Sequence, residues 1–396
     1  MNQPPMPGAP ATGVARRMAG IEPFHVMEVL VRARELEAQG RDVVHMEIGE
    51  PDFPTPAPVV QAALRAAEKG AVFYTPALGL PELRQAISGW YRTRYGVEVP
   101  ASRIAVTPGA SGALLLACGV SVDPGAQVLM ADPGYPCNRH FVRFCEGEAA
   151  GIPVGAESGY QLDAARVAGA WTPRTTGVLL ASPSNPTGTL VPEPQLRAIF
   201  EATRERGGVL MVDEIYHGLT YGCEARTALA ISDDIFVVNS FSKYFGMTGW
   251  RLGWLVAPER YQREVEKLAQ NLFISASTVA QHAALAAFAP ETVAILEQRR
   301  GEFRRRRDFL LPALRELGFA IPVTPEGAFY VYADCSRFGP DSQRFALDLL
   351  EQAGVAITPG LDFGSDRPGS HVRFAYTTSM ERLEEGVARL RRFLES

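Results

Sequence analysis

Lys243 is the residue whose setting most clearly suggests chemistry. Only three of the 39 basic residues are lysines, and Lys243 follows the apolar run 236–238 after a short serine-containing segment. An amine held at the end of a buried strand loses solvation, so its pKa falls towards neutrality, as a lysine that forms a Schiff base requires. Lys69, at an expected helix end, and Lys267, on a charged helix face, have ordinary settings. We therefore expect any lysine chemistry at Lys243.

Small residues follow the apolar run 104–106 and open an expected helix. Gly109, Ala110 and Ser111 could bring backbone N–H groups and one hydroxyl to a phosphate at the start of that helix. The alternative is a plain glycine turn. The chain contains no G-x-G-x-x-G pattern and no Gly-Lys pair, so the dinucleotide-binding and P-loop interpretations lack their motifs.

Other polar side chains also follow apolar runs, where open α/β sheets bind ligands. Tyr135 offers an aromatic face or packs in a proline turn, and Asn185 exposes an amide. Asp213 closes an apolar run, where a buried carboxylate needs a partner, and the phenol of Tyr216 comes three residues later. Asp213 and His217 could instead be metal ligands, but no third ligand lies nearby in the sequence, and we expect no metal.

These residues make sense around one molecule. For a flat cationic heterocycle, the chain offers an aromatic face, an anion and hydrogen-bonding groups: Tyr135, Asp213, Asn185 and Tyr216. For a phosphate arm it offers hydroxyls and a guanidinium: Ser111, Ser240, Ser242 and Arg251. For an aldehyde it offers the amine of Lys243. Pyridoxal 5′-phosphate has all three parts.

The order and spacing of three runs carry a family resemblance. They are Ser-Asn-Pro-Thr-Gly at 184–188, Val-Asp-Glu-Ile-Tyr at 212–216 and Ser-Phe-Ser-Lys at 240–243, the last followed by Gly-Trp-Arg-Leu-Gly-Trp at 249–254. With them the chain resembles the class I/II pyridoxal-phosphate-dependent aminotransferases of the aspartate aminotransferase superfamily, which have fold type I. The resemblance implies a homodimer that exchanges an amino group between an L-amino acid and a 2-oxo acid by a ping-pong route.

The resemblance also implies roles for individual residues. Lys243 would hold the cofactor as a Schiff base and, once freed, move the proton between substrate Cα and cofactor C4′. Asp213 would keep the ring nitrogen protonated. Arg373, helped by Asn185 and the backbone of Gly49, would bind the substrate α-carboxylate.

Two further residues bear on the subunit partner and the substrate. Tyr74 is implied to reach the phosphate of the neighbouring subunit, so that active sites are shared across the dimer. Phe24 and Val26 lie in the segment that covers the substrate side chain in the family, and they favour apolar over dicarboxylic amino acids. The alternative for Phe24 is simple packing against a helix.

Composition excludes several classes of function. The net charge of −5 provides no basic field for nucleic acid, and no apolar run approaches the ~18 residues of a membrane span. Five irregularly spaced cysteines favour reduced thiols and a cytoplasmic protein. Two alternatives remain open: another fate of the same cofactor chemistry, as in a carbon–sulfur β-lyase or an aminocyclopropanecarboxylate synthase, and a non-catalytic ligand-sensing domain.

The pattern of elements predicts an α/β protein of two unequal domains. Six short apolar runs, at 104–106, 128–130, 178–180, 209–212, 236–238 and 252–256, indicate a mostly parallel sheet covered by helices on both faces. The family resemblance implies a sheet of the seven-stranded type. Long helical patterns occupy 261–288 and 290–317, and an α+β pattern follows. We expect a loose arm at 1–17, a segment at 18–50 that packs on the small domain, a large cofactor-binding domain at 51–289, and a small α+β domain at 290–396.

Overall fold

A seven-stranded sheet forms the centre of the larger unit in this computed structural model, which describes residues 13–395. The strand order is β2-β8-β7-β6-β5-β3-β4, and all neighbours are parallel except β8, which runs antiparallel to β2 and β7. The strands are β2 (Ile104–Thr107), β3 (Gln127–Asp132), β4 (Glu148–Pro153), β5 (Thr175–Ala181), β6 (Val209–Asp213), β7 (Ile235–Ser240) and β8 (Gly253–Val256). This confirms the mostly parallel sheet predicted from the sequence.

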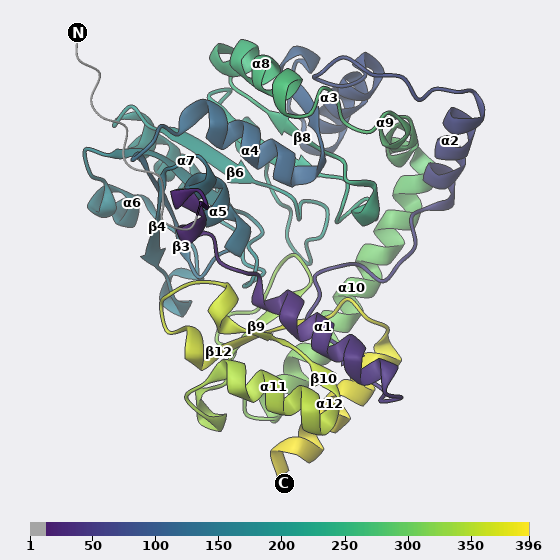
Figure 1. The fold of residues 1–396 in the computed structure, drawn as a ribbon, viewed down its shortest axis with the longest axis vertical. Coiled ribbons are helices and arrows are strands. Elements are labelled where there is room, and N and C mark those ends of the chain that lie inside the picture. Colours follow the sequence, from purple (N-terminus) through teal and green to yellow (C-terminus); the bar gives the residue numbers. More distant parts are fainter. Residues whose placement is uncertain (1–12, 396) are drawn as a thin grey trace.

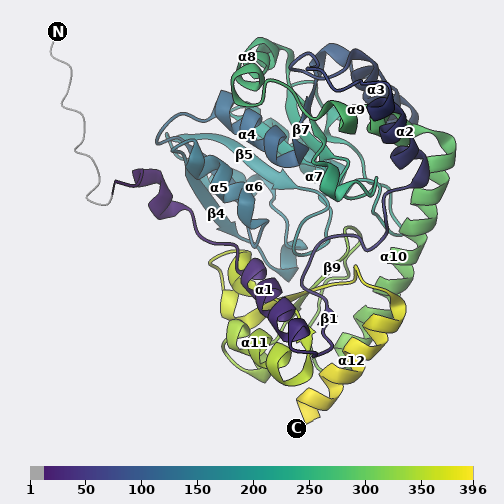
Figure 2. The same cartoon turned by 45° about the vertical axis from the view of Figure 1, so that its right-hand side comes forward.

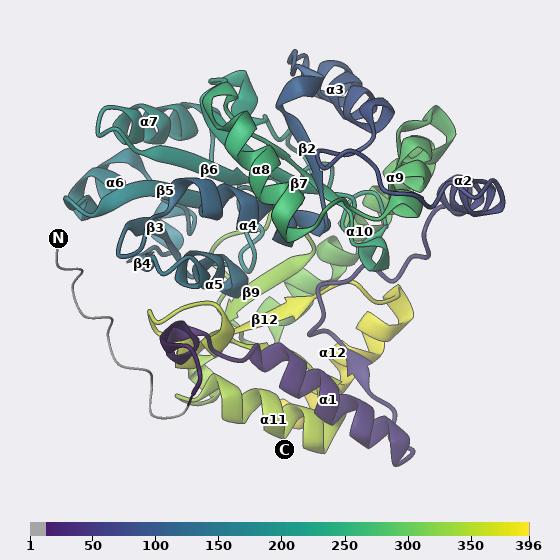
Figure 3. The ribbon, with the colours of Figure 1, turned by 45° about the horizontal axis from the view of Figure 1, so that its top comes forward.

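Helices cover both faces of this sheet (Figures 1 and 3). They are α2 (Ala57–Glu68), α3 (Pro81–Tyr95), α4 (Gly109–Ser121), α5 (Pro136–Phe144), α6 (Ala164–Ala170), α7 (Glu193–Arg204), α8 (Gln262–Leu272) and α9 (Thr278–Leu285). Along β5, Leu179 belongs to the core cluster that includes α4, whereas Val178 and Leu180 belong to the cluster that includes α7. Because successive side chains of a strand point to opposite faces, this strand is apolar on both.

The single helix expected over 261–288 is wrong, because the chain breaks between α8 and α9. Ile274 has a φ of 64°, a left-handed conformation that a β-branched residue rarely adopts inside a helix. Ser277 then caps the next helix, since its side chain accepts a hydrogen bond from the N–H of Ala280.

A smaller unit lies below the large sheet and is built on a three-stranded antiparallel sheet of order β11-β12-β9 (Figure 1). Its elements are α10 (Pro290–Glu316), β9 (Tyr330–Asp334), α11 (Ser342–Ala353), β10 (Val355–Ala356), β11 (Thr358–Pro359), β12 (His371–Ala375) and α12 (Met380–Glu395). The long α10 contacts α2 of the larger unit and α12 of the smaller one, and Figure 2 shows it along one side of both. The boundary at residue 290 stays a prediction.

The segment before the large sheet joins the smaller unit. Helix α1 (His25–Ala38) contacts β10 and β11, and β1 (Val44–His45) pairs in parallel with β10. Figure 3 shows α1 lying beside α11, and Arg32 of α1 donates a hydrogen bond to Glu351 of α11. Most of the arm predicted at 1–17 lies outside the described residues. Among those described, Arg16–Gly20 forms a 3₁₀ helix.

All five cysteines are free thiols. Within residues 13–395, no single helix has the length and apolarity to cross a membrane; the bent pair Thr278–Phe288 and Pro290–Glu316 would qualify, though only by length and composition.

Candidate active site

A cavity of about 240 Å³ lies where the large sheet faces the smaller unit. Strand β6 ends at Asp213, β7 ends three residues before Lys243, and β12 of the other sheet contributes Arg373. The structure brings these three into the lining of one cavity, together with Phe24, Gly49, Ala110, Ser111, Tyr135, Asn185, Tyr216, Ser242 and Arg251. The residues predicted separately from distant parts of the sequence therefore meet in one place.

The amine of Lys243 forms no ion pair with a carboxylate of residues 13–395 and is held by a backbone carbonyl instead. Its Nζ donates a hydrogen bond to the carbonyl of Gly49 at 2.6 Å and lies 5.6 Å from the ring centroid of Phe329 and 6.0 Å from that of Tyr216. Burial lowers the pKa of Lys243 to about 8; the carboxylates of Glu50 and Asp213 oppose this lowering, and Arg373 and Arg251 add to it. A substantial fraction of this amine is therefore neutral near pH 8 and can act as a nucleophile.

Asp213 is a buried carboxylate with an incomplete set of partners. Its Oδ1 accepts a hydrogen bond from the N–H of Ile215 at 3.0 Å, and the side chain also lines the cavity. Burial raises the pKa of Asp213 to about 6, against the lowering by that hydrogen bond and by Lys243. A cationic group placed in the cavity would stabilise the ionised form of this carboxylate.

Arg373 is fixed from three directions and retains one unused donor. Its Nη1 donates to Oδ1 of Asn185 at 2.9 Å, and its Nη2 donates to the carbonyl of Glu47 and, at 3.1 Å, to Oγ1 of Thr358. The guanidinium lies 4.2 Å from the ring centroid of Tyr330. The buried Nε has no partner among residues 13–395, so a carboxylate that entered the cavity would satisfy a donor that is otherwise left unpaired.

The loop before α4 approaches Arg251 closely. Gly109 has a φ of 69°, and a Cβ at this position would lie 2.5 Å from Nη2 of Arg251. The left-handed backbone conformation therefore favours glycine, and a side chain here would displace the end of Arg251. Ala110 and Ser111 follow at the start of α4, where helix N–H groups remain without intrahelical partners.

Two serine hydroxyls complete this side of the site. The hydroxyls of Ser240 and Ser242 lie 2.8 Å apart, and Nη1 of Arg251 is 3.5 Å from the Ser242 hydroxyl. Ser242 and Arg251 line the cavity, whereas Ser240 supports Ser242 from behind. The arrangement offers hydroxyls, helix N–H groups and one guanidinium, the donor set that a phosphate group requires.

Tyr330 is a site residue that the sequence did not reveal. Its hydroxyl lies 2.9 Å from the hydroxyl of Tyr216, its ring lies under the guanidinium of Arg373, and a Cβ on Gly49 would overlap its hydroxyl. Tyrosine is common in buried strands, and the sequence around β9 carries no other signal. Its contacts with Tyr216 and Arg373 become visible only in the folded chain.

The segment 46–49 also forms part of the site, and of its residues only Gly49 was predicted. The carbonyl of Met46 accepts from Ala375 N–H, that of Glu47 from Arg373, that of Ile48 from the Thr377 hydroxyl, and that of Gly49 from Lys243. This segment thereby links the substrate-facing arginine to the lysine. Carbonyl contacts of this kind do not depend on side-chain identity, so no sequence signal could have found them.

Tyr74 does not belong to the cavity of its own chain. It lies in the exposed segment before α3, with Phe73 82% and Tyr74 80% exposed. Phe24 and Val26, by contrast, line the cavity, and the Phe24 ring meets that of Tyr135 edge-on with centroids 6.3 Å apart.

The alternative of a metal at Asp213 and His217 is not supported by their contacts. The buried His217 lies with Nδ1 3.3 Å from the Tyr95 hydroxyl and 3.4 Å from Oε2 of Glu214, and burial lowers its pKa to about 3. Over the described part of the chain, no group of three or more His, Cys, Asp and Glu residues could hold a metal ion.

Comparison with known proteins assigns this fold and site to a family. Residues 41–390 match the family described as aminotransferase class I and II. The chain is 40% identical over 380 residues to the valine–pyruvate aminotransferase of Mycobacterium tuberculosis, covering 96% of this chain and 98% of that protein. It is 37% identical over 385 residues to the aspartate/prephenate aminotransferase of Thermus thermophilus, covering 96% and 99%. The crystal structure of an aminotransferase from Mycobacterium tuberculosis matches with a TM-score of 0.93 and 40% identity, covering 96% of this chain and 99% of that one.

An α/β fold of type I with a lysine, a buried aspartate and an arginine around one cavity defines a pyridoxal-phosphate-dependent transferase of the aspartate aminotransferase superfamily. The chain belongs to the class I and II aminotransferases, and it transfers an amino group between an amino acid and a 2-oxo acid.

Proposed function

We propose that the chain carries pyridoxal 5′-phosphate on Lys243 and transfers the amino group from L-amino acids with uncharged, apolar side chains by a ping-pong route. The observation that carries the proposal is the meeting of Lys243, Asp213 and Arg373 in a single cavity, to which Asp213 and Arg373 come from strands of two different sheets and Lys243 from the loop after a third strand. Among residues 13–395, each of the three is open to a ligand: Lys243 is a partly neutral amine, Asp213 is a carboxylate with no ion pair, and Arg373 is a guanidinium with an unpaired N–H.

The residues present fit this cofactor part by part. The backbone of Gly109 and Ala110, the hydroxyls of Ser111 and Ser242, and Arg251 would bind the phosphate. Tyr135 would stack on the ring, Asn185 and Tyr216 would donate hydrogen bonds to the ring oxygen, and Asp213 would pair with the ring nitrogen. When bound, the cofactor supplies an aldehyde that accepts the amino group and an electron-withdrawing ring that makes the substrate Cα acidic.

The chain's own side chains would then orient the substrate and move its proton. Arg373 would hold the α-carboxylate, and Asn185, which already accepts a hydrogen bond from its Nη1, would fix the arginine in place. Lys243, with a pKa lowered by burial, would accept the proton from Cα and deliver it again on the cofactor side. Tyr216, held by Tyr330, would keep the ring oxygen hydrogen-bonded throughout.

A donor with an apolar side chain fits the remaining wall of the cavity. Phe24, Val26, Ile48, Leu114 and Ile215 line it, whereas its cations are Lys243, Arg251 and Arg373, each assigned above to the cofactor or the α-carboxylate. A second carboxylate buried here without a cation would be costly, while each extra methylene gains about 1–3 kcal/mol. The name of the Mycobacterium relative, a valine–pyruvate aminotransferase, supports the same preference.

A panel of half-reactions tests this proposal. Leucine, methionine, alanine, phenylalanine and aspartate are each mixed with the loaded enzyme, and conversion of the cofactor to its amine form is followed by absorbance. We expect the apolar donors to give a higher kcat/KM than aspartate. Aspartate as the best donor would contradict the substrate preference, and release of pyruvate and ammonia without cofactor conversion would indicate a lyase.

A further inference from the structure

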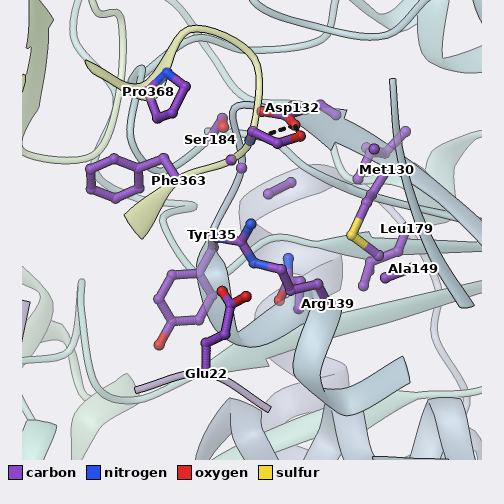
Figure 4. A pocket seen from close by; sticks show the side chains of 18 of the residues that line it. Glu22, Met130, Asp132, Tyr135, Arg139, Ala149, Leu179, Ser184, Phe363 and Pro368 are labelled. Carbon is purple, nitrogen blue, oxygen red and sulfur yellow. Dashed lines mark hydrogen bonds between the residues drawn. The ribbon is translucent and has the colours of Figure 1, made fainter. Parts of the chain in front are cut away.

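A second cavity, of about 550 Å³, lies beside the cofactor cavity and shares Tyr135 and Ala181 with it. Its walls come from the ends of β3 and β5, the edge strand β4, helix α5 and the loop 361–368 of the smaller unit. Figure 4 shows Tyr135 and Arg139 side by side on its wall, with Phe363 across from them. No step proposed above uses this cavity.

One short segment separates the two cavities. Glu22 and His25 line the second cavity, whereas Phe24, Val26 and Met27 line the first. The edge-on contact between the rings of Phe24 and Tyr135 is part of the same wall between the two cavities. The segment that covers the substrate side chain therefore also faces the second cavity.

Two arginines give this second cavity a cationic wall. Arg139 and Arg143 lie one turn apart on α5 and are both half-buried. Arg139 donates to the carbonyls of Pro136 and Asp362, and Arg143 donates to that of Gly20 at 2.8 Å. Neither forms an ion pair with a carboxylate among residues 13–395. Burial lowers the pKa of Arg139, and the nearby carboxylates of Asp132, Glu22 and Asp362 oppose this lowering without contacting the guanidinium.

The carboxylates that line the cavity do not neutralise this pair by contact. Asp132 accepts hydrogen bonds from the N–H and hydroxyl of Ser365, each at 2.9 Å, and Glu22 is exposed at the rim. Donors on Arg139 and Arg143 therefore remain available to an anion.

Asn138 also lines the cavity, and its side chain is only 6% exposed. Its buried Oδ1 has no hydrogen-bond partner in the described part of the chain. An amide oxygen accepts hydrogen bonds, as a carboxylate does, so it is the N–H₂ group of this side chain that can donate to a carboxylate in the cavity.

Arg143 also connects this cavity to the surface. It lines a shallow hollow of about 530 Å³ together with Arg16, Arg17 and Gly20. Shared residues thus join three hollows, from the surface through Arg143 to the second cavity, and through Tyr135 to the cofactor cavity. Arginines line the outer two together with carboxylates: Glu146, which pairs with Arg17, lines the surface hollow, and Glu22 and Asp132 line the second cavity.

We propose that the second cavity is a carboxylate-binding antechamber, in which Arg139, Arg143 and Asn138 bind a small carboxylate beside the cofactor site. The identity of the natural ligand rests on the proposed function, because the substrates of an aminotransferase are amino acids and 2-oxo acids. The carboxylate is either the α-carboxylate of an incoming substrate or the distal carboxylate of a dicarboxylic acid.

Succinate is a suitable probe, because it has no amino or oxo group and is not turned over. Equilibrium dialysis of the loaded enzyme with labelled succinate should give two bound molecules per subunit. The double variant Arg139→Gln/Arg143→Gln should retain one succinate, the one bound at Arg373, which perturbs the cofactor absorbance. The variant Arg373→Gln should also retain one succinate, the one in the second cavity, which leaves the absorbance unchanged. Binding does not require turnover, so this result stands or falls separately from the aminotransferase proposal.

Matched variants control for charge and folding. Arg197→Gln/Arg263→Gln removes two exposed arginines of α7 and α8 and should keep both succinates. Arg139→Lys/Arg143→Lys preserves the charge and should also keep both, whereas Asn138→Asp adds a negative charge and should lose the second. The proposal would be overturned if the wild-type enzyme binds a single succinate, or if the double variant Arg139→Gln/Arg143→Gln still binds two.

The steady-state kinetics of the double variant Arg139→Gln/Arg143→Gln identify the source of the carboxylate. An approximately tenfold loss of kcat/KM for both pyruvate and 2-oxoglutarate, with kcat unchanged, indicates capture of incoming α-carboxylates. A loss for 2-oxoglutarate alone indicates the distal carboxylate. No loss for either acid would refute a functional antechamber.

Discussion

The hydroxyl of Tyr330 on β9 lies 2.9 Å from that of Tyr216, which follows β6, so a hydrogen bond joins the two sheets at the active site. The ring of the same Tyr330 lies under the guanidinium of Arg373. One side chain therefore contacts both the group proposed to bind the substrate carboxylate and the group proposed to bind the cofactor ring oxygen.

Replacing Tyr330 should separate these two contacts. Tyr330→Phe keeps the ring under Arg373 but removes the hydrogen bond to the Tyr216 hydroxyl. Such a hydrogen bond contributes about 1 kcal/mol. We expect a kcat about fivefold lower, a shift in the pH titration of the cofactor absorbance, and little change in KM. Tyr330→Leu also removes the stacked ring, worth ~2 kcal/mol when desolvated, and should raise KM. Equal KM effects in both variants would contradict a separate role for the hydroxyl.

Asp213→Asn should act on the chemical step. The amide keeps the shape of the side chain but no longer stabilises a protonated ring nitrogen, so the cofactor withdraws electrons less strongly. We expect kcat to fall by about 10²-fold or more, as for the loss of one preorganised electrostatic contact, with a smaller change in KM. Single-turnover kinetics with a good donor measure this directly. A kcat near that of the wild type would exclude the proposed role.

Loading of the cofactor-free enzyme should depend on pH through Lys243. Only the neutral amine attacks the aldehyde, and burial lowers the pKa of Lys243 to about 8. The loading rate should therefore rise about tenfold per pH unit below that pKa and level off above it. Stopped-flow absorbance between pH 6 and 9.5 checks the profile. A rate that continues to rise to the end of this range would mean an ordinary, solvated lysine.

Sharing of sites across a dimer can be tested by mixing two inactive or weakened variants. Tyr74→Phe removes the implied phosphate contact, and Lys243→Ala removes the nucleophile. If Tyr74 serves the neighbouring subunit, each hybrid dimer has one intact site, and an equal mixture restores activity at about a quarter of all sites. Assay at low cofactor concentration reveals the gain. If the mixture is no more active than the separate variants, Tyr74 either acts within its own subunit or has no role in activity.

The strands of the large sheet were predictable because most of them are fully buried and read as short apolar runs. Strand β4 escaped because it lies at the edge, where Glu148–Pro153 consists mostly of small residues and none of them is fully buried. The spacing of Val26, Val29, Ala33 and Leu36 along α1 was an available helical signal that the prediction did not use.

The residues of the candidate site also fall into two groups, those that could be predicted from the sequence and those that could not. Residues that carry their own chemistry, such as Lys243, Asp213 and Arg373, could be selected from the sequence. The contacts that hold them could not, because Thr358, Tyr330 and the carbonyl of Glu47 act through geometry rather than residue type. The break after α8 was missed because helical spacing continues across Ile274 although the backbone there is left-handed.

The most direct measurement is the location of the covalent cofactor. The loaded enzyme is reduced with borohydride and digested, and the modified peptide is identified by mass spectrometry, with Lys243→Ala as the control. The account predicts a single pyridoxyl group on Lys243 and no covalent cofactor in the variant. A modification on Lys69 or Lys267, or none in the wild type, would contradict it.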